Sequence, residues 1–268
     1  MTRLAPFRKG RPVRHADGSA GDADYGRIGA RYTEYRRPDP RISAVILEAL
    51  GGACTVLNVG AGPGSYEPRD RALTAVEPSE AMRARRPPGL SVAVNATAEA
   101  LPFEDASFEA SMAIFTVHQW RDLDAGLAEL RRVTTGPVVV MTFHPDAADR
   151  FWLNEYAPEV ISTMARRDPP IRRLTDALGT RSEVRRVPIP RECTDGFCEA
   201  YYGRPEAFLD PGARSACSVW SFVEDGVVAR FERELSSDLR SGRWDARHGA
   251  LRTLPQFDGS LRLVIGCG

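Results

Sequence analysis

A short apolar run that leads directly into spaced glycines constrains the fold of this chain more than any other feature. Residues 55–59 are apolar and rich in β-branched side chains, as is typical of a buried strand. Gly60, Gly62 and Gly64 follow at alternate positions. Glycine lets the backbone turn with positive φ and lets another group approach closely. Because open α/β sheets bind ligands beyond the carboxyl ends of their strands, the motif predicts such a sheet with a ligand site here.

Strand-like and helix-like segments alternate along much of the chain. Asp39 and Pro40 predict the start of a helix that ends at Gly51, and Ser79 predicts the cap of another that Pro87 ends. This alternation favours a Rossmann-like, seven-stranded, mostly parallel sheet with helices on both faces and a helical cap over the C-terminal strand ends. After 55–59, strands are expected at 72–76, 90–94, 108–115, 138–143, 184–189 and 261–265, and helices at 123–133 and 149–164.

The spacing after the first strand disfavours a dinucleotide. The dinucleotide motif needs G-x-G-x-x-G, with a helix whose N-terminus holds the pyrophosphate. Here the spacing is G-x-G-x-G, and Ser65 or Tyr66 stands where the third glycine is required. Only residues 65–71, interrupted by Pro68, separate the loop from the second strand. With scarcely room for a helix, NAD is disfavoured, whereas S-adenosylmethionine carries no phosphate and loses little.

An acidic residue ends the second strand. Glu77 lies thirteen residues after Gly64, and a carboxylate there can accept hydrogen bonds from both hydroxyls of a ribose. The alternative is a surface acid stabilised by the dipole of the helix that follows. The glycine loop favours the ribose role.

Several ordered motifs resemble class I S-adenosylmethionine-dependent methyltransferases, in particular the type 11 group. Residues 56–64 are similar to the first motif of that family, and 74–82 to its acidic loop. Residues 98–103 resemble its A-E-x-L-P-F segment, and 108–120 and 127–133 its fourth strand and the helix that follows. The resemblance covers about residues 25–143 and implies transfer of a methyl group from S-adenosyl-L-methionine.

The resemblance also implies cofactor-binding residues. The glycine loop would line the methionine part, Glu77 would bind the ribose, and Pro78 with Met82 would lie against the adenine. Phe115 would border the site of methyl transfer, and an N-terminal segment would close over the cofactor. The implied cofactor-binding residues are Tyr25, Tyr32, Arg36, Gly60, Ala61, Gly62, Gly64, Glu77, Pro78, Met82, Thr97, Ala98 and Phe115.

Two residues depart from the family pattern. Asn58 stands where the first motif usually has an acid, and Thr97 stands where an acid usually faces the adenine. Both changes predict an altered affinity for S-adenosyl-L-methionine rather than a loss of its binding. They also keep open a protein that binds the cofactor as a sensor or partner without methyl transfer; an NAD-dependent oxidoreductase is a further alternative.

His118 is the candidate catalytic residue. It follows the fourth strand of the pattern at the ligand end of the sheet. A base is needed only where the acceptor is a hydroxyl, an acidic carbon or a protonated amine. The alternative is a histidine that fixes its loop by hydrogen bonds. The acceptor atom, whether O, N, C or S, is left open.

The composition of the chain limits the kinds of partner that we expect it to bind. Lys and Arg number 36, as do Asp and Glu, so the broad positive field used in nucleic-acid binding is missing. The five cysteines form no C-x-x-C motif, which indicates neither a disulfide framework nor a zinc or other metal site. No apolar run approaches the ~20 residues of a membrane span. We expect a cytoplasmic protein that acts on a small-molecule acceptor, without nucleic acid or membrane as a partner; its oligomeric state is left open.

The pattern divides the chain into three parts. Residues 1–24 are basic and then rich in Gly, Asp and Ala, which predicts a flexible tail. Residues 25–145 are expected to form the S-adenosylmethionine-binding core. Residues 146–268 are expected to complete the sheet and to supply the helical cap and the substrate region.

Overall fold

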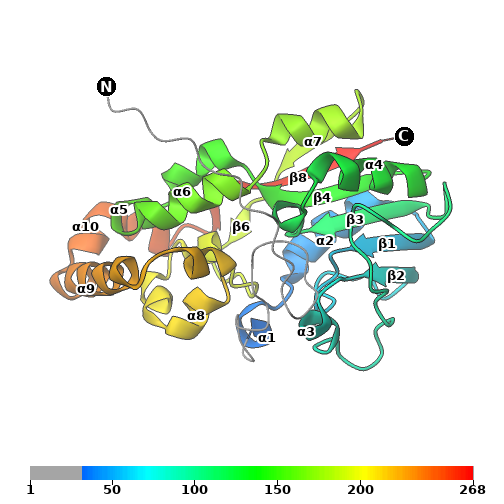
Figure 1. Ribbon diagram of the computed structural model, residues 1–268. Helices are drawn as coiled ribbons and strands as arrows, with labels where there is room; N and C mark the ends of the chain where they lie inside the picture. Colours follow the sequence, from blue (N-terminus) through cyan, green and yellow to red (C-terminus); the bar gives the residue numbers. More distant parts are fainter. Residues whose placement is uncertain (1–31, 268) are drawn as a thin grey trace, which may run out of the picture.

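The computed structural model describes residues 32–267, so the predicted tail and Tyr25 lie outside the described residues. The main sheet has six strands in the order β2-β1-β3-β4-β8-β5 (Figure 1). Neighbours among β1 to β4 are parallel, and β8 is antiparallel to both β4 and β5. This confirms the Rossmann-like α/β fold class. The strands are β1 (Thr55–Val59), β2 (Ala72–Val76), β3 (Ala110–Ile114), β4 (Val138–Phe143), β5 (Glu183–Arg186) and β8 (Leu261–Gly266).

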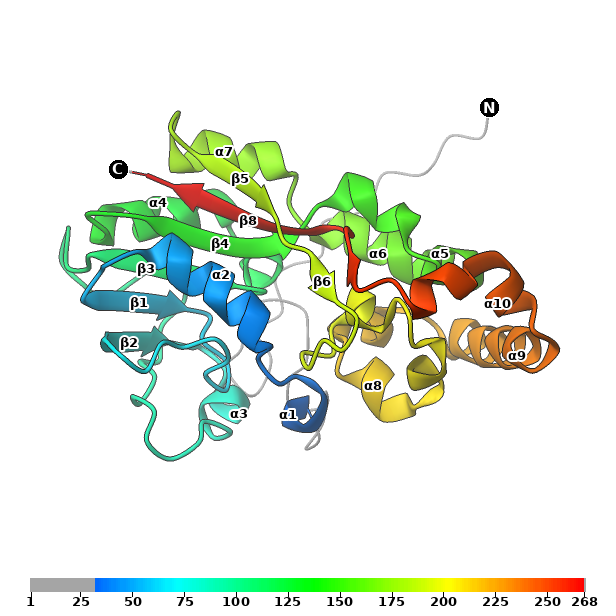
Figure 2. The same ribbon diagram turned by 180° about the vertical axis from the view of Figure 1, so that it is seen from behind.

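Helices cover both faces of the sheet, as the opposite views in Figures 1 and 2 show. On one face, α2 buries Ile42 and Ile46 against the strands. On the other face, α4 buries Leu127 and Leu130. The Asp39 carboxylate caps α2 as the sequence predicts. The helices that cover the sheet are α2 (Pro40–Leu50), α4 (Leu123–Val133) and α7 (Ile171–Leu178).

The connection from β1 to β2 positions the candidate site. Residues 60–71 form turns, with no helix in this part of the described chain, as the spacing predicts. β1 pairs with β2 on one side and with β3 on the other. The chain therefore runs from β1 to β2 on one side of β1 and then crosses over to β3 on the other side. Open α/β sheets bind ligands at such a switch point.

The strand expected at 90–94 is wrong, and the main sheet has six strands instead of seven. The segment makes only the bridge between Val76 and Val94. Val92 is 92% exposed, so this segment buries too little against the sheet to extend the pairing. The helix before this segment, α3 (Glu80–Arg83), is capped by Ser79 as expected but ends at Arg83, before Pro87.

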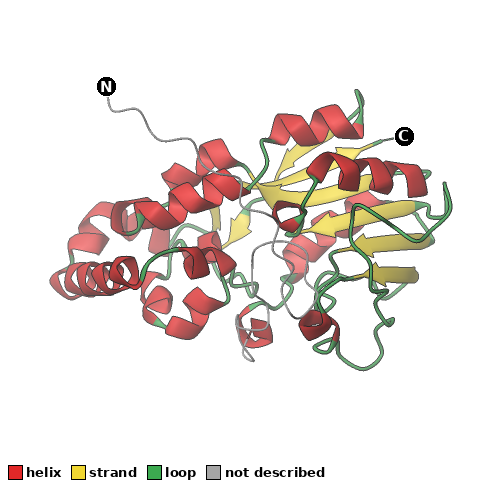
Figure 3. Ribbon diagram, in the orientation of Figure 1, coloured by secondary structure: helices red, strands yellow, loops and turns green. Residues whose placement is uncertain are grey.

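Residues 145–167 and 189–257 form the expected cap beyond the carboxyl ends of the parallel strands (Figure 3). The helix expected at 149–164 is broken, since Pro158 begins a new helix. Trp152, Phe208 and Trp244 are buried and pack edge to face in the same apolar cluster as α2. None of the helices in the described range is long and apolar enough to cross a membrane.

The remaining elements are short apart from α9. They are α1 (Tyr32–Tyr35), η1 (Val117–Gln119), η2 (Pro145–Arg150), α5 (Leu153–Tyr156), α6 (Pro158–Arg167), β6 (Ile189–Pro190), η3 (Cys198–Tyr201), η4 (Pro205–Leu209), α8 (Pro211–Ser215), η5 (Ser218–Phe222), α9 (Asp225–Ser241), α10 (Arg243–His248), η6 (Gly249–Arg252) and β7 (Gln256–Phe257).

Candidate active site

The glycine loop has the geometry of a cradle. Gly60 and Gly62 have φ of 71° and 51°. A Cβ at Gly60 would lie 2.0 Å from Thr116 Oγ1, whereas a Cβ at Gly62 would meet nothing within 4 Å. The backbone N–H groups of Gly60 and Ala61 both donate to the Val76 carbonyl at 2.9 Å. The loop is therefore fixed to the end of β2, and the backbone at Gly62 borders open space.

Glu77 is buried beside this loop. Its carboxylate accepts hydrogen bonds from the backbone N–H of Gly62 at 2.7 Å and of Ser79 at 2.8 Å. Burial raises the pKa of Glu77, and these two hydrogen bonds partly oppose the rise. Each oxygen keeps a second lone pair, so the carboxylate can also accept hydrogen bonds from a ligand.

A first cavity of about 880 Å³ lies over the ends of β1, β2 and β3. Gly64 and Thr97 do not line it, and Tyr25 lies outside the described residues. Ten of the implied cofactor-binding residues lie in its wall: Tyr32, Arg36, Gly60, Ala61, Gly62, Glu77, Pro78, Met82, Ala98 and Phe115.

Gly64 and Thr97 pack against other parts of the protein and do not line the first cavity. A Cβ at Gly64 would lie 2.2 Å from Leu90 Cδ1, so glycine there permits close packing below the loop. The Thr97 carbonyl accepts a hydrogen bond from the Ala100 N–H in a turn. Its neighbours Ala98 and Glu99 lie in the cavity wall instead. Binding roles for Gly64 and Thr97 therefore have no support from this cavity.

The departure at Asn58 is partly compensated. Its side-chain amide donates to Glu67 Oε1 at 3.1 Å, and Glu67 forms an ion pair with Arg86 at 2.9 Å. Asn58 lines the first cavity, and Glu67 does not. The Glu67 carboxylate therefore lies behind Asn58, outside the cavity wall, and its charge is paired with that of Arg86.

Gln119 provides a test of whether a polar cofactor fits this cavity. It lies in the wall, and both its Nε2 and its Oε1 are buried without a hydrogen-bond partner among the described residues. A buried amide without hydrogen-bond partners costs folding free energy, and such a group commonly binds a ligand or a water molecule. With the glycine cradle and Glu77, the site matches the polar edges of an adenosyl group.

A second cavity of about 630 Å³ adjoins the first and shares Tyr32, Arg36 and Phe115 with it. His118 lines this second cavity and not the first. His118, the candidate base, therefore lies on the side of Phe115 that faces away from the first cavity, where an acceptor would bind. Its other lining residues are Phe143, Met164, Arg167, Asp168, Phe197, Cys198, Ala216, Cys217, Ser218 and Val219.

Phe115 stands between the two cavities in an unusual conformation. Its φ is 56°, a region that residues other than glycine seldom adopt. Its N–H donates to the Met141 carbonyl at 2.9 Å, which holds the backbone in place. Its ring stacks on Phe143 with centroids 5.3 Å apart. Strain of this kind is concentrated at functional sites.

His118 faces an acid that sequence analysis missed. His118 Nδ1 lies 3.7 Å from Asp168 Oδ1. Asp168 is buried and accepts a hydrogen bond from the Thr142 hydroxyl at 3.3 Å. Burial raises the pKa of Asp168 to about 7, against the lowering effects of Thr142 and Arg167. Fifty positions separate His118 from Asp168, so no local pattern pairs them.

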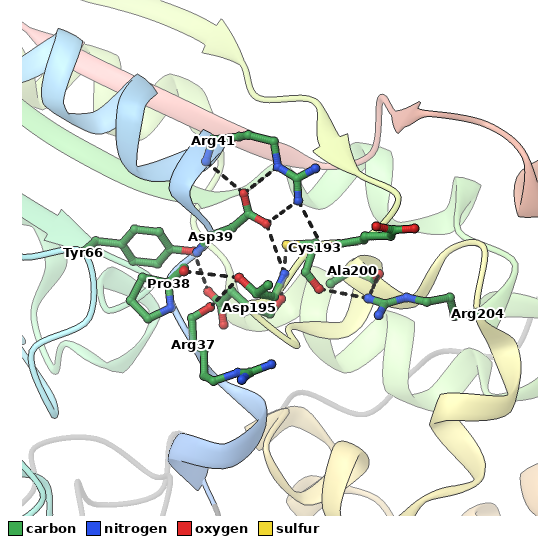
Figure 4. A network of polar contacts seen from close by, with 11 residues as sticks. Arg37, Pro38, Asp39, Arg41, Tyr66, Cys193, Asp195, Ala200 and Arg204 are labelled. Carbon is green, nitrogen blue, oxygen red and sulfur yellow. Dashed lines mark hydrogen bonds and ion pairs between the residues drawn. The ribbon is translucent and has the colours of Figure 1, made fainter.

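A polar network joins three distant segments beside the first cavity (Figure 4). The buried Asp195 carboxylate accepts hydrogen bonds from the Arg36 side chain and from the Tyr66 hydroxyl. Close by, the Thr194 N–H donates to Asp39 Oδ2 at 3.1 Å. The cap thereby fixes Arg36 and Tyr66, which both line the first cavity.

Comparisons with known proteins find similarity to methyltransferases. Residues 57–137 match the family described as "Methyltransferase domain". A malonyl-[acyl-carrier protein] O-methyltransferase of Erwinia pyrifoliae is 34% identical over 120 residues, which are 42% of this chain and 46% of that protein. The chain thus spans about half the length of this curated relative.

Solved structures extend the likeness over most of the chain. A protein of Anabaena variabilis, described as a methyltransferase and assigned to an antibiotic biosynthesis pathway, superposes with a TM-score of 0.81 at 27% identity. That match covers 87% of this chain and 99% of the other. An S-adenosylmethionine-dependent methyltransferase of Thermotoga maritima shares the fold, with a TM-score of 0.50, 13% identity, and 88% and 91% of the two chains covered.

Proposed function

We propose that this chain, a member of the S-adenosylmethionine-dependent methyltransferases, methylates a small molecule bound in its second cavity. One observation carries the proposal. The first cavity has a cradle suited to the cofactor, and Phe115, Arg36 and Tyr32 form the boundary between that cavity and the second. A donor and an acceptor bound on the two sides of this boundary would be neighbours.

The residues of the first cavity suit each part of the cofactor. Glu77 would accept hydrogen bonds from the ribose hydroxyls, and the backbone of Gly60 and Gly62 would border the methionine part. Pro78 and Met82 would pack against the adenine, and Gln119 would gain the partners that its buried amide lacks among the described residues. When bound, the cofactor supplies a methyl group already activated by a sulfonium.

The chain itself needs to orient the acceptor and exclude water. Orientation of two reacting groups contributes roughly 7–11 kcal/mol in favourable cases. Phe115, Phe143 and Phe197 form a compact aromatic group at the boundary, with centroids 5.3–5.6 Å apart. These rings would keep water from the line of transfer. His118 would take a proton where the acceptor carries one.

The lining of the second cavity favours a small molecule as acceptor. Aromatic and apolar side chains form much of it, with a few polar groups among them, as is typical of small-molecule sites. The Erwinia relative is named for an acceptor attached to a carrier protein. An acceptor delivered on a carrier is therefore the second candidate, and its reactive end would occupy the same cavity.

The experiment measures cofactor binding first. Calorimetry with S-adenosylmethionine and with its demethylated product should show binding to the parent protein. Glu77→Ala should weaken binding at least about tenfold, since a charge-assisted hydrogen bond is worth about 1.5–3 kcal/mol. Glu80→Ala, an exposed acid at the start of α3, is the matched control and should bind as the parent does.

Three outcomes separate the alternatives. No binding by the parent, or full binding by Glu77→Ala, would show the proposal to be wrong. Tight binding of NADH in place of S-adenosylmethionine would indicate an oxidoreductase. Binding without methyl transfer to any extracted metabolite or carrier-bound acyl group would favour the sensor.

A further inference from the structure

A buried cluster of three side chains lies beside the glycine loop. The Glu67 carboxylate accepts hydrogen bonds from Arg86 Nη1 at 3.0 Å and from Arg86 Nη2 at 2.9 Å. The side chain of Glu67 is 1% exposed and that of Arg86 is 6% exposed. Asn58 is the third member, and its Nδ2 donates to Glu67 Oε1 at 3.1 Å. Because Arg86 Nη1 also donates to the Gly62 carbonyl at 3.3 Å, the cluster links the end of β1, the glycine loop and the segment after α3.

Glu67 fixes the direction in which the Asn58 amide points. A carboxylate only accepts hydrogen bonds, whereas a side-chain amide carries a donating nitrogen and an accepting oxygen on the same carbon. Glu67 therefore requires Nδ2 on its own side, and this turns Oδ1 away from it. A reversed amide would place Oδ1 against a carboxylate oxygen, and the two acceptors would repel each other. Of the two amide orientations, only one is compatible with Glu67.

The Asn58 Oδ1 atom is free to accept a hydrogen bond from a ligand. Asn58 lines the first cavity, whereas Glu67 and Arg86 do not. No group of the described residues donates to Oδ1, and this oxygen is not one of the fully buried side-chain atoms that lack a partner there. Oδ1 is therefore the polar atom that Asn58 presents to the cavity.

The position of Asn58 indicates which part of the cofactor it would meet. Asn58 lies in β1 two residues before Gly60, and Gly60 and Gly62 would border the methionine part. The only hydrogen-bond donor of that part is its α-ammonium group, since a carboxylate and a sulfonium donate none. Glu77 follows β2 and would take the ribose hydroxyls instead. An amide oxygen can accept from the ammonium group, and hydrogen bonds to a charged partner are stronger than those between neutral groups.

We infer that Glu67 is a positioning residue for cofactor binding: it holds the Asn58 amide so that Oδ1 accepts a hydrogen bond from the α-ammonium group. The inference rests on the proposed function and names the group that recognises the amino-acid end of the cofactor. The charge of Arg86 balances that of Glu67, so the cluster is neutral as a whole. An acid at position 58 in place of the amide would add a second negative charge beside Glu67.

The first test concerns the Asn58 amide. Calorimetry compares S-adenosylhomocysteine, the demethylated cofactor, with an analogue that lacks the α-amino group and is otherwise identical. The parent should bind S-adenosylhomocysteine at least about tenfold more tightly than the analogue, as expected for one charge-assisted hydrogen bond. Asn58→Leu, which has a side chain of similar size, should bind the two compounds with equal affinity. No preference in the parent, or the full preference in Asn58→Leu, would overturn the inference.

The second test exchanges the amide and the acid. At pH 8, Asn58→Asp places a second carboxylate within hydrogen-bonding distance of Glu67, where two like charges repel. This variant should be less stable to denaturant than the parent and should bind S-adenosylhomocysteine at least about tenfold more weakly. In Asn58→Asp/Glu67→Gln the new amide can donate to the new carboxylate, whose second oxygen would face the cavity. The double variant should therefore be more stable than Asn58→Asp and bind S-adenosylhomocysteine within about threefold of the parent, or more tightly.

Glu67→Gln alone shows whether Glu67 acts through Asn58. A glutamine can donate to Oδ1 as well as accept from Nδ2, so it no longer fixes the amide. The preference for S-adenosylhomocysteine over the analogue should fall at least about threefold, whereas a purely structural role would weaken binding of both compounds equally. Asn95→Asp is the matched control, because Asn95 is exposed and does not line the first cavity. It adds the same charge as Asn58→Asp and should leave unfolding and binding as in the parent.

The outcomes separate this inference from the proposed function. A double variant that is less stable than Asn58→Asp, or that binds S-adenosylhomocysteine no more tightly, would remove Glu67 from its role. An unchanged preference for the α-amino group in Glu67→Gln would do the same. Tight binding of S-adenosylhomocysteine and of the analogue by the parent, without a preference, would overturn the inference and leave the methyltransferase intact. Failure of the parent to bind S-adenosylmethionine or S-adenosylhomocysteine would overturn the proposed function itself.

Discussion

The hydroxyl of Tyr66 donates a hydrogen bond of 2.9 Å to the carboxylate of Asp195, a residue 129 positions further along the chain. Tyr66 belongs to the connection between β1 and β2, and Asp195 belongs to the cap. Asp195 also holds Arg36, which precedes α2. One buried carboxylate therefore joins the glycine-loop connection, the N-terminal segment and the cap at the edge of the first cavity.

Removing this carboxylate should weaken both folding and cofactor binding. Asp195→Ala leaves the Arg36 guanidinium, whose side chain is 13% exposed, without its ion-pair partner. Breaking a buried pair in this way costs about 3–5 kcal/mol. Denaturant unfolding should show a loss of this order, and calorimetry should show weaker binding of S-adenosylmethionine because Arg36 and Tyr66 line the cavity.

Asp70→Ala is the control for that prediction. Asp70 forms an ion pair with its neighbour Arg71 on the surface, and we expect unfolding and binding to remain as in the parent. Unchanged stability of Asp195→Ala would contradict the role assigned to the network.

Gly60 and Gly62 should respond differently to alanine. A methyl group at Gly60 would overlap Thr116 and would also be strained by the positive φ, so Gly60→Ala should lower the free energy of unfolding by more than about 2 kcal/mol. Gly62→Ala meets open space and should cost only the strain of about 1–2 kcal/mol. Its methyl group would narrow the cavity, so S-adenosylmethionine should bind more weakly. Equal losses of stability in the two variants would argue against this geometry.

Gln119→Leu should separate stability from binding. The Gln119 amide is buried without a hydrogen-bond partner among the described residues, so an apolar side chain of similar shape should leave the ligand-free protein as stable or more stable. If the amide binds the cofactor, the same change should weaken S-adenosylmethionine binding by about 1–2 kcal/mol. Thermal unfolding with and without the cofactor measures both effects. A variant that loses stability without ligand would show that the amide has a structural partner.

The elements around the glycine loop could be predicted because their signals are local. The helix at α2 has its cap and stop within the segment, and β1, β2 and β4 are short β-branched runs with the observed bounds. The segment at 90–94 has the same local composition but lies at the sheet edge, with Val92 exposed. Composition alone cannot distinguish an edge bridge from a buried strand.

Only one part of the candidate site could be predicted from the sequence, namely the wall formed by the glycine loop and the end of β2. Motif residues such as Gly62 and Glu77 lie close to their partners in sequence, and they meet in one wall of the first cavity. Asp168, Asp195 and Tyr66 gain their roles from tertiary contacts with residues far along the chain. No spacing rule links such pairs, so the cap side of the site emerged only from the structure.

Buried carboxyl groups should make stability fall as pH rises through neutrality. Burial raises the pKa of Asp168 to about 7 and that of Glu199 to about 7, whereas the same groups in the unfolded chain titrate near their ordinary values. Between pH 4 and 7 the folded protein therefore holds more protons than the unfolded chain. A state that binds more protons is weakened as pH rises, so the free energy of unfolding should decrease over this interval by on the order of a few kcal/mol per group.

Below pH 4 the effect on stability is opposite, because Asp39 makes the free energy of unfolding decrease as pH falls. Although burial opposes it, hydrogen bonds from Arg41 and Thr194 lower the pKa of Asp39 to about 2, so its contribution is lost as pH falls toward that value. Unfolding in urea across pH 3 to 8 would show the resulting maximum. Asp168→Asn and Glu199→Gln mimic the protonated forms, so the double variant should match the parent near pH 4 and decline less by pH 7. A double variant whose stability declines as steeply as that of the parent would show that neither carboxyl takes up a proton on folding.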